Sequence, residues 1–245
     1  MSLNAPVWRS FVAAFAFAIT LGLVTGCAPT PLPPPTPTIA APADFPAEFY
    51  DTATGGSVYT VDPARSSIEI RVYRDGPLAR FGHNHVITGA IEGRMFQANE
   101  FDQSRADLYV SVLDLVVDDG AARAAAGREF ASEVDPDAIA GTRGNLLGPA
   151  VLDAAAHPHL KARVEPITAS DRFMTTLFVR DHVAPAPIPI NWQLDGDSVK
   201  AYASFEVHQS ELGITPFSVM GGGLRVKDTI EIHIEVNATL EQNHP

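Results

Sequence analysis

The sequence contains very little cysteine and few basic residues. Cys27 is the only cysteine among 245 residues, so no disulfide can form within the chain. The 17 Lys and Arg residues stand against 29 Asp and Glu residues, which gives a net charge of −12. This balance excludes the basic face that nucleic-acid binding requires. We therefore expect no nucleic-acid partner.

The chain also lacks the motifs of common enzyme classes. It has no serine-nucleophile elbow, no phosphate-binding loop and no zinc-protease helix. The three glycines at 221–223 resemble a phosphate loop only superficially and are typical of a turn between strands. We expect neither an enzyme nor a cofactor.

What the N-terminus does contain is the pattern of an export signal. Arg9 supplies positive charge, and the apolar run 11–24 is shorter than the roughly 20 residues of a membrane-spanning helix. The run ends in Val-Thr-Gly-Cys, which resembles a bacterial lipobox. We predict a lipoprotein signal peptide over 1–26 and lipid attachment at Cys27. An ordinary secretory signal with a chance cysteine is the alternative.

Residues 27–56 form a predicted linker. The stretch 28–49 is rich in proline and almost uncharged, a composition that favours extended polyproline II and cannot form a packed core. It predicts a semi-rigid spacer behind a lipid anchor, with a proline-rich partner motif as the alternative. If the source is Gram-negative, Ala28 in place of an aspartate predicts the periplasmic face of the outer membrane.

Alternating apolar and polar residues dominate the chain over 57–241. The strands are expected at 66–74, 86–97, 106–112, 158–168, 172–182, 187–194, 198–208 and 229–236. Their single apolar face is typical of an antiparallel sheet that is wet on its other side. Residues 120–134 and 135–160 have helical character, with Asp135 or Asp137 as a candidate cap. We predict a mainly β protein: an antiparallel eight-stranded barrel, closed or nearly closed, with a short helical excursion.

A barrel of this strand number can enclose one elongated small ligand. The candidate ligand contacts are the apolar positions on the inward strand faces, some of which must instead seal the core. They are Ile68, Ile70, Val72, Leu108, Val110, Phe205, Val207, Ile230, Ile232 and Ile234.

Two histidines, His83 and His85, precede a predicted strand. If that strand is regular, they share its inward face with Ile87, Gly89 and Ile91. Three interpretations stay open. The histidines are structural groups bonded to a loop, polar groups at a cavity mouth that contact a ligand headgroup, or metal ligands.

A metal site would need more than this pair, because structural zinc usually has four ligands. His157, His159 and His208 are the candidates to complete it. However, His208 lies opposite the apolar face of its strand, and Pro158 separates the other two. Our prediction is no metal, and the alternative is a metal-binding or redox-stress accessory protein that uses His83 and His85.

Three segments, 59–72, 145–164 and 205–238, resemble the YceI-like family. The closing segment, with Leu-Gly-Ile at 212–214 followed by Pro216 and Asp228, is the most specific. In place of the glycine-rich stretch that many members have after the first strand, this chain carries the His83–His85 segment. The resemblance covers 57–241 and implies a lipocalin-like barrel domain.

The same resemblance implies a function and a ligand. Such a protein binds, stores or transports a polyisoprenoid or similar long-chain lipid in the bacterial cell envelope. We expect an exported, lipid-anchored protein, and a homodimer is one assembly that the sequence leaves open. A third alternative is an envelope scaffold whose barrel core is filled.

Overall fold

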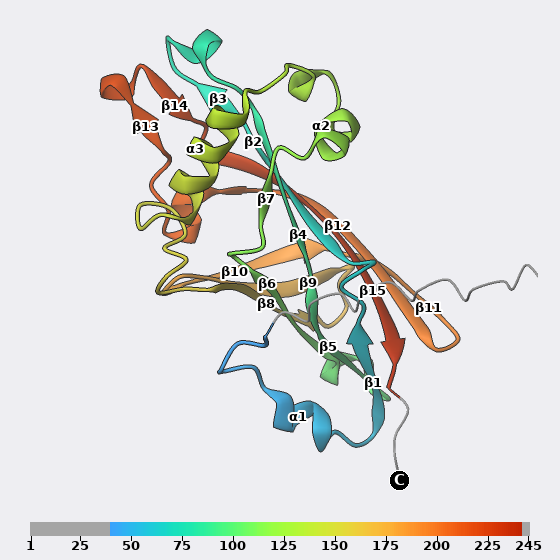
Figure 1. Ribbon diagram of the computed structural model, residues 1–245. Coiled ribbons are helices and arrows are strands. Elements are labelled where there is room, and N and C mark those ends of the chain that lie inside the picture. The colour runs from blue at the N-terminus through green and yellow to red at the C-terminus, as the bar shows by residue number, and fades with distance from the viewer. Residues whose placement is uncertain (1–39, 242–245) are drawn as a thin grey trace, which may run out of the picture. The chain divides into compact units, whose positions relative to one another are not determined.

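The computed structural model describes residues 40–241 of the chain (Figure 1). The predicted export signal, the lipid attachment at Cys27 and the first part of the linker lie outside these residues. Within residues 40–241, no helix is both long enough and apolar enough to span a membrane.

The described residues are mainly strands, and all their pairings are antiparallel. The strands are β1 (Gly56–Val61), β2 (Ser67–Val72), β3 (Arg74–Asp75), β4 (His85–Ala90), β5 (Glu92–Ala98), β6 (Arg105–Ser111), β7 (Val116–Val117), β8 (His159–Pro166), β9 (Arg172–Val179), β10 (His182–Pro189), β11 (Asn191–Asp195), β12 (Ser198–His208), β13 (Ser218–Val219), β14 (Leu224–Val226) and β15 (Thr229–Leu240).

Helices are short and few among the described residues. The α-helices are α1 (Ala47–Asp51), α2 (Gly120–Ala126) and α3 (Pro136–Leu147), and the 3₁₀ turns are η1 (Ala79–Phe81), η2 (Phe101–Gln103), η3 (Arg128–Phe130), η4 (Gln209–Leu212) and η5 (Met220–Gly222). Of the two predicted candidates, Asp135 caps α3, because its carboxylate accepts a hydrogen bond of 2.8 Å from the Asp137 N–H. This bond satisfies one of the free donors at the helix start.

Twelve strands form one sheet in the order β10-β9-β8-β6-β5-β1-β15-β2-β4-β7, and β12, with β11 beside it, pairs with β15. The predicted fold class, mainly β with an antiparallel lipocalin-like sheet and a short helical excursion, is confirmed. The twelve strands exceed the expected eight because two expected strands are divided and because β1 and β7 were not expected. Ile91 separates β4 from β5, and Ile190 separates β10 from β11.

β15, the last described strand in sequence, lies in the middle of the sheet. One edge pairs with β12 from Thr229 to Thr239. The other edge pairs first with β2, over 231–235, and then with β1, over 238–240. β15 therefore joins the two halves of the sheet.

β10 and β12 lie side by side, yet no continuous ladder joins them. The β11–β12 ladder ends at the pair Asn191–Tyr202, and within residues 40–241 no further pairs continue it into β10. β10 carries Pro185, Pro187 and Pro189 at alternate positions. Proline has no N–H, so the edge of β10 that faces away from β9 lacks donors at three positions. The prolines therefore prevent a regular ladder at this seam.

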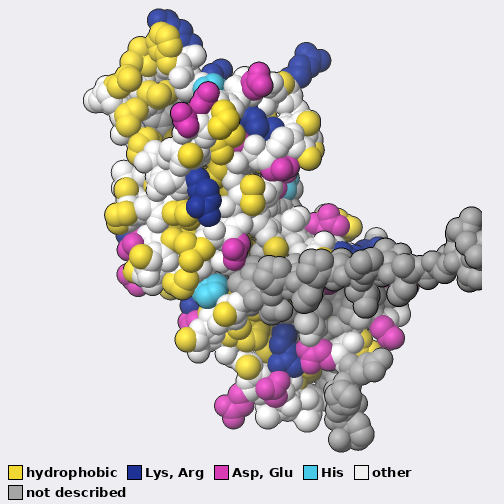
Figure 2. Space-filling view, viewed as in Figure 1, with side chains coloured by type: hydrophobic (Ala, Val, Ile, Leu, Met, Phe, Trp, Pro, Cys, Tyr) yellow, Lys and Arg dark blue, Asp and Glu magenta, His cyan; other side chains and the backbone are white. Residues whose placement is uncertain are grey.

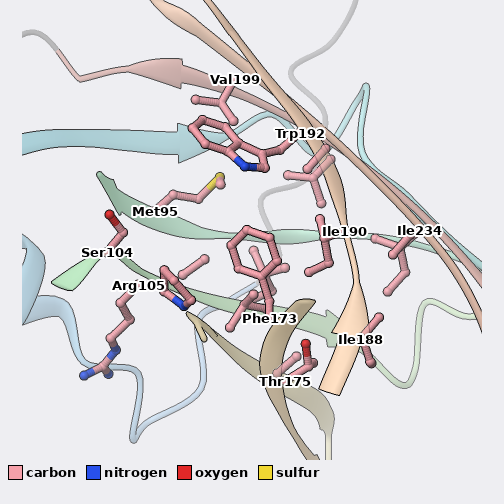
Figure 3. A pocket seen from close by; sticks show the side chains of 18 of the residues that line it. Met95, Ser104, Arg105, Phe173, Thr175, Ile188, Ile190, Trp192, Val199 and Ile234 are labelled. Carbon is pink, nitrogen blue, oxygen red and sulfur yellow. The ribbon is translucent and has the colours of Figure 1, made fainter. Parts of the chain in front are cut away.

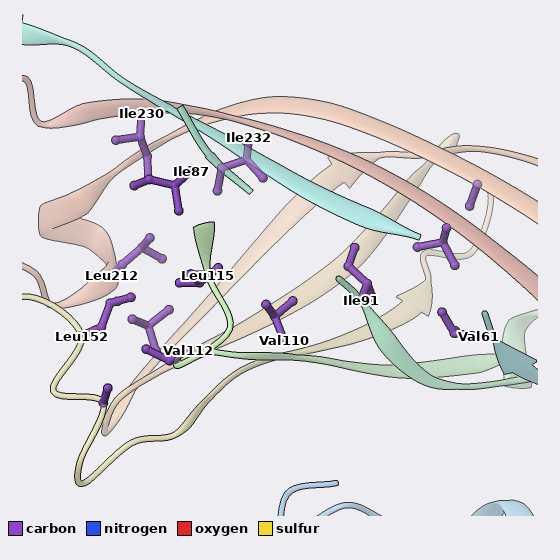
Figure 4. Close-up of a cluster of buried hydrophobic side chains, with 14 of the residues drawn as sticks. Val61, Ile87, Ile91, Val110, Val112, Leu115, Leu152, Leu212, Ile230 and Ile232 are labelled. Atoms are coloured by element: carbon purple, nitrogen blue, oxygen red, sulfur yellow. The ribbon is translucent and has the colours of Figure 1, made fainter. Parts of the chain in front are cut away.

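The inward face of the sheet forms one large hydrophobic core (Figure 4). Ile87, Ile230 and Ile232 are each more than nine-tenths buried in it. Gly89 belongs to the same face, since a side chain there would meet Leu115 and Val110 at less than 3 Å. The predicted inward register of this strand from residue 85 onward is therefore correct.

The opposite face of β4 is also covered, which the alternating pattern does not indicate. Val86 is fully buried, and Phe130 of η3 is 1% exposed. α2 and η3 form a small layer over this part of the sheet (Figure 1). This end of the sheet therefore has protein on both faces.

The last part of the predicted linker packs against the sheet. Tyr50 of α1 is buried, and its hydroxyl donates a hydrogen bond of 2.8 Å to Asp107. Phe45 packs edge to face on Tyr109. The linker prediction over 27–56 thus extends too far, because the aromatic residues of 45–50 form a small second core on β5 and β6.

Candidate functional site

Three cavities lie along the inner face of the sheet. The central cavity, about 140 Å³, is lined by apolar side chains from β2, β4, β6, β12 and β15, together with Leu146 of α3 and with Val151 and Leu152, which follow α3. Lys161 and Gln209 are among its few polar lining residues. Such a lining favours an apolar ligand.

Figure 3 shows the aromatic-end cavity, which has a volume of about 130 Å³ and shares lining residues with the central cavity. Phe101 stacks on Trp192 with 5.4 Å between ring centroids and meets Phe173 edge to face. Phe101 and Trp192 are partly exposed. The Thr175 hydroxyl, buried in the wall, has no hydrogen-bond partner within residues 40–241.

The histidine-end cavity, about 230 Å³, lies at the other end and is more polar. His83 and His85 line it together with Arg74 and Arg225. Part of its wall is apolar and comes from β2, β13 and β14.

The three cavities share walls and so form a series. The aromatic-end and central cavities have five lining residues in common, namely Leu108, Ala162, Leu177, Phe205 and Ile234. The central and histidine-end cavities share Val72, Ile87, Leu146, Val151 and Gln209. The series is apolar along most of its length and polar at one end.

The structure brings most of the sequence-predicted contacts into this series. The central cavity is lined by Ile68, Ile70, Val72, Leu108, Val110, Phe205, Ile230, Ile232 and Ile234. His83 and His85 line the histidine-end cavity. Val207 lines none of the three cavities and packs against the hydrophobic core instead.

His85 is held by a buried ionic cluster at the edge of β4. Its Nδ1 lies 2.6 Å from Oδ2 of Asp118, whose side chain is fully buried. The other oxygen of Asp118 accepts from the Val86 N–H at 3.0 Å and pairs with Arg123 Nη1 at 2.5 Å. Asp118 has a positive φ of 56°, a conformation that the surrounding contacts must stabilise.

These contacts set the charge of the cluster. Burial by itself raises the pKa of Asp118, but the hydrogen bonds from His85 and the Val86 N–H outweigh it and hold that pKa below its ordinary value. Asp118 is thus a carboxylate at neutral pH and orients the ring of His85 through Nδ1. Burial and the nearby charges of His85, Arg123 and Arg74 lower the pKa of His83.

The surroundings of His85 agree with two of the three interpretations, a structural group bonded to a loop and a polar group at a cavity end. His85 is bonded to the segment after β7, and it also faces the end of the cavity series. His83 lies before β4 rather than in it, and its ring centroid is 6.4 Å from that of His85.

The other histidines have separate surroundings. His157 lies near Asp181, and His159 Nε2 is bonded to the Ala40 carbonyl at 2.9 Å. His208 contacts Thr229. Within residues 40–241, no three His, Cys, Asp or Glu side chains are grouped so that they could hold a metal ion.

Several lining residues were not singled out from the sequence. The aromatic end depends on Phe101, Phe173 and Trp192, which come from three separate segments. Leu146 and Val151 reach the cavity from the helical excursion, which has no strong amphipathic pattern. To identify these residues from the sequence, one would have to know where their segments cross the ends of the barrel.

An antiparallel sheet with an apolar, polar-ended series of cavities is typical of a protein that binds an apolar ligand. A model of the YceI-like domain matches residues 59–238, and the chain belongs to this family, whose members bind polyisoprenoids or lipids. The family has a binding-protein fold and is not known for enzymatic activity.

Solved structures resemble the chain at low sequence identity. The crystal structure of Burkholderia cenocepacia BcnA matches with 12% identity and a TM-score of 0.49, covering 73% of this chain and 99% of that one. The YCEI protein of Campylobacter jejuni matches with 10% identity and a TM-score of 0.38, covering 58% and 75%. No curated protein shows a significant match.

Proposed function

We propose that this protein binds, stores or transports a polyisoprenoid, or a similar long-chain lipid, in the bacterial cell envelope. The observation that carries the proposal is the series of three cavities with shared walls, apolar along most of its length. Burying an apolar chain contributes about 0.8 kcal/mol per methylene group. A long chain in such a cavity needs no catalytic residue to bind well.

The polar end of the ligand is proposed to lie at the histidine-end cavity. Asp118 holds the His85 ring through Nδ1, which leaves Nε2 as the ring atom available for a headgroup. Arg74 and Arg225 add positive charge to the same lining. A hydroxyl or anionic headgroup would find two arginines and two histidines in this lining, whereas Lys161 is the one cationic side chain that lines the central cavity.

The test is native mass spectrometry of the purified full chain, followed by organic extraction of any bound lipid. We expect the wild-type protein to carry, or to take up, isoprenoid alcohols such as geranylgeraniol. Ala162→Phe places a large ring in the wall shared by two cavities and should abolish uptake. Ala121→Phe, on the exposed surface of α2, is the matched control. A wild-type protein that is empty and takes up no isoprenoid would refute the proposal.

The envelope location is proposed from the N-terminal sequence. Cys27 would be acylated, and two or more acyl chains make such an anchor stable. In a Gram-negative source the protein would lie on the periplasmic face of the outer membrane. Cys27→Ser should block acylation, which intact-mass measurement of the membrane fraction detects. A wild-type protein with a free thiol in the soluble periplasmic fraction would contradict this part of the proposal.

A further inference from the structure

A small cationic lobe projects beside the histidine-end cavity. We define it as residues 74–81 together with 217–227, which contain β3, η1, β13, η5 and β14. Its strands form their own three-stranded sheet in the order β13-β14-β3. The lobe stands at the upper end of the molecule in Figure 1.

The tip of the lobe exposes large apolar side chains. Met220 is 75% exposed, Phe81 64% and Val219 37%. Met220 has a positive φ of 52°, which is strained for a side chain of this size. Figure 2 shows hydrophobic side chains gathered on this part of the surface. Exposed apolar groups at the tip of a loop are costly in water and indicate a binding surface.

The charge of the lobe is opposite to that of the whole protein. It contains Arg74, Arg80, Arg225 and Lys227 against the single acid Asp75, whereas the whole chain carries −12. All four basic residues are exposed. The Arg80 guanidinium lies 4.5 Å from the centre of the Phe81 ring. Cationic and apolar groups at one tip match the headgroups and the acyl boundary of an anionic membrane.

The opposite end of the cavity series provides a comparison. It also exposes apolar residues, with Trp192 37% and Leu194 44% exposed. The exposed charges around it are mainly acidic, with Glu100, Asp102, Asp171, Asp195 and Asp197 against Arg172 and Lys200. An anionic membrane would repel this end. Of the two ends, the lobe alone combines apolar exposure with positive charge.

We propose that the cationic lobe docks the protein on an anionic lipid surface. Arg225, Leu224 and Val219 of the lobe are also part of the wall of the histidine-end cavity. Docking would therefore place the polar end of the cavity series at the membrane, where a lipid ligand enters or leaves. The role in ligand exchange rests on the proposed function, whereas the docking itself does not.

The experiment compares the two ends within one background. Cys27→Ser removes the natural thiol, and Met220→Cys or Leu194→Cys supplies a single site for an environment-sensitive fluorophore. Each full-length protein is reconstituted with vesicles of phosphatidylethanolamine and phosphatidylglycerol that contain a nitroxide-labelled lipid as quencher. Since both proteins have the same N-terminal residues, any difference between the labels comes from the two ends.

We expect strong quenching at position 220, weak quenching at 194, and loss of the difference at high salt or on phosphatidylcholine vesicles. Arg80→Gln and Lys227→Gln should weaken the contact by about fivefold for each cation removed. Neither residue has an ion pair with a described residue, so their removal should leave the fold intact. Arg172→Gln is the control at the opposite end.

Equal quenching at both positions, stronger quenching at 194, or indifference to the phosphatidylglycerol would overturn the docking proposal. Native mass spectrometry on the same samples separates it from the proposed function. If the protein docks through position 220 but neither carries nor takes up an isoprenoid, the docking proposal stands and the proposed function is refuted.

Discussion

Two edge strands of the main sheet, β7 and β10, are protected in different ways. β7 has two residues, is followed at once by the buried Asp118–Arg123 pair, and contacts α3, while α2 packs on the neighbouring strand β4. β10 is exposed on its outer face and is protected by Pro185, Pro187 and Pro189, which remove N–H donors. Both devices prevent pairing with another chain.

The difference teaches how the sheet combines a fixed side with a looser one. Covering β7 requires a buried charge cluster, which ties three segments together. The prolines of β10 remove N–H donors without any further contact. As a result, β10 pairs with β9 but forms no ladder with the adjacent β12. We therefore expect substitutions near β7 to have large effects on stability and those on β10 to have small ones.

The largest expected effect is that of Arg123→Met. Arg123 is 7% exposed, pairs with Asp118 and donates to the Asn84 and Ser132 carbonyls. Its loss leaves a buried carboxylate without its arginine partner, and we expect a decrease of about 3–5 kcal/mol in the free energy of unfolding. Denaturant titration measures this value. Arg128→Met, on the exposed surface of η3, is the control, and an equal effect there would show that the pair is unimportant.

A second prediction concerns acid. The pKa of Asp118 in the folded protein lies below its ordinary value of 3.8. The unfolded chain therefore binds the proton more readily, and the stabilisation is fully present above about pH 4 and is lost as the pH falls through the folded value. Asp118→Asn should remove this part of the pH dependence. The measurement is the difference in unfolding free energy between wild type and variant from acid to neutral pH; a constant difference would contradict the assignment.

An intermediate effect is expected where β10 begins. Gly213, after η4, has a φ of +72°, and a side chain there would lie 3.0 Å from the His182 side chain. Gly213→Ala should cost about 1–2 kcal/mol through backbone strain and this contact. Gly196→Ala, in the turn between β11 and β12, has a similar φ of +57° but open space around it. Thermal unfolding of both variants isolates the contact; equal losses would mean that β10 is not held at this point.

The smallest effect is expected on the outer face of β10. Val183 is 54% exposed, so Val183→Lys should change the unfolding free energy by no more than about 0.5 kcal/mol. Chemical denaturation of the variant checks this. A loss well above 1 kcal/mol would show that another part of the protein covers the outer face of β10. The protection of β10 would then resemble that of β7.

The alternating pattern of the sequence predicted the strands and most of the cavity lining. Residues 198–208 coincide with β12, and the inward set of β2 and β15 faces the central cavity. Period-two alternation was sufficient there because one face of each strand is wet.

The same pattern could not predict where a second layer covers the wet face. Val86 is buried under α2 and η3, and Tyr50 is buried on β6, although neither segment has a strong periodic signal. The ionic cluster was missed for a related reason. Asp and Arg are residue types that usually lie on the surface, and only the tertiary fold brings Asp118 and Arg123 together with His85.

The central place of β15 has a consequence for the order of folding. Synthesis begins at the N-terminus, whereas β1, β2 and β12 all pair with β15. The pairing of β1 with β15 closes a loop of nearly the whole described chain, and such high contact order makes folding slow. Until residues 229–240 have been synthesised, β1, β2 and β12 each keep one edge unpaired, so a late-folding chain would suit the export that we propose.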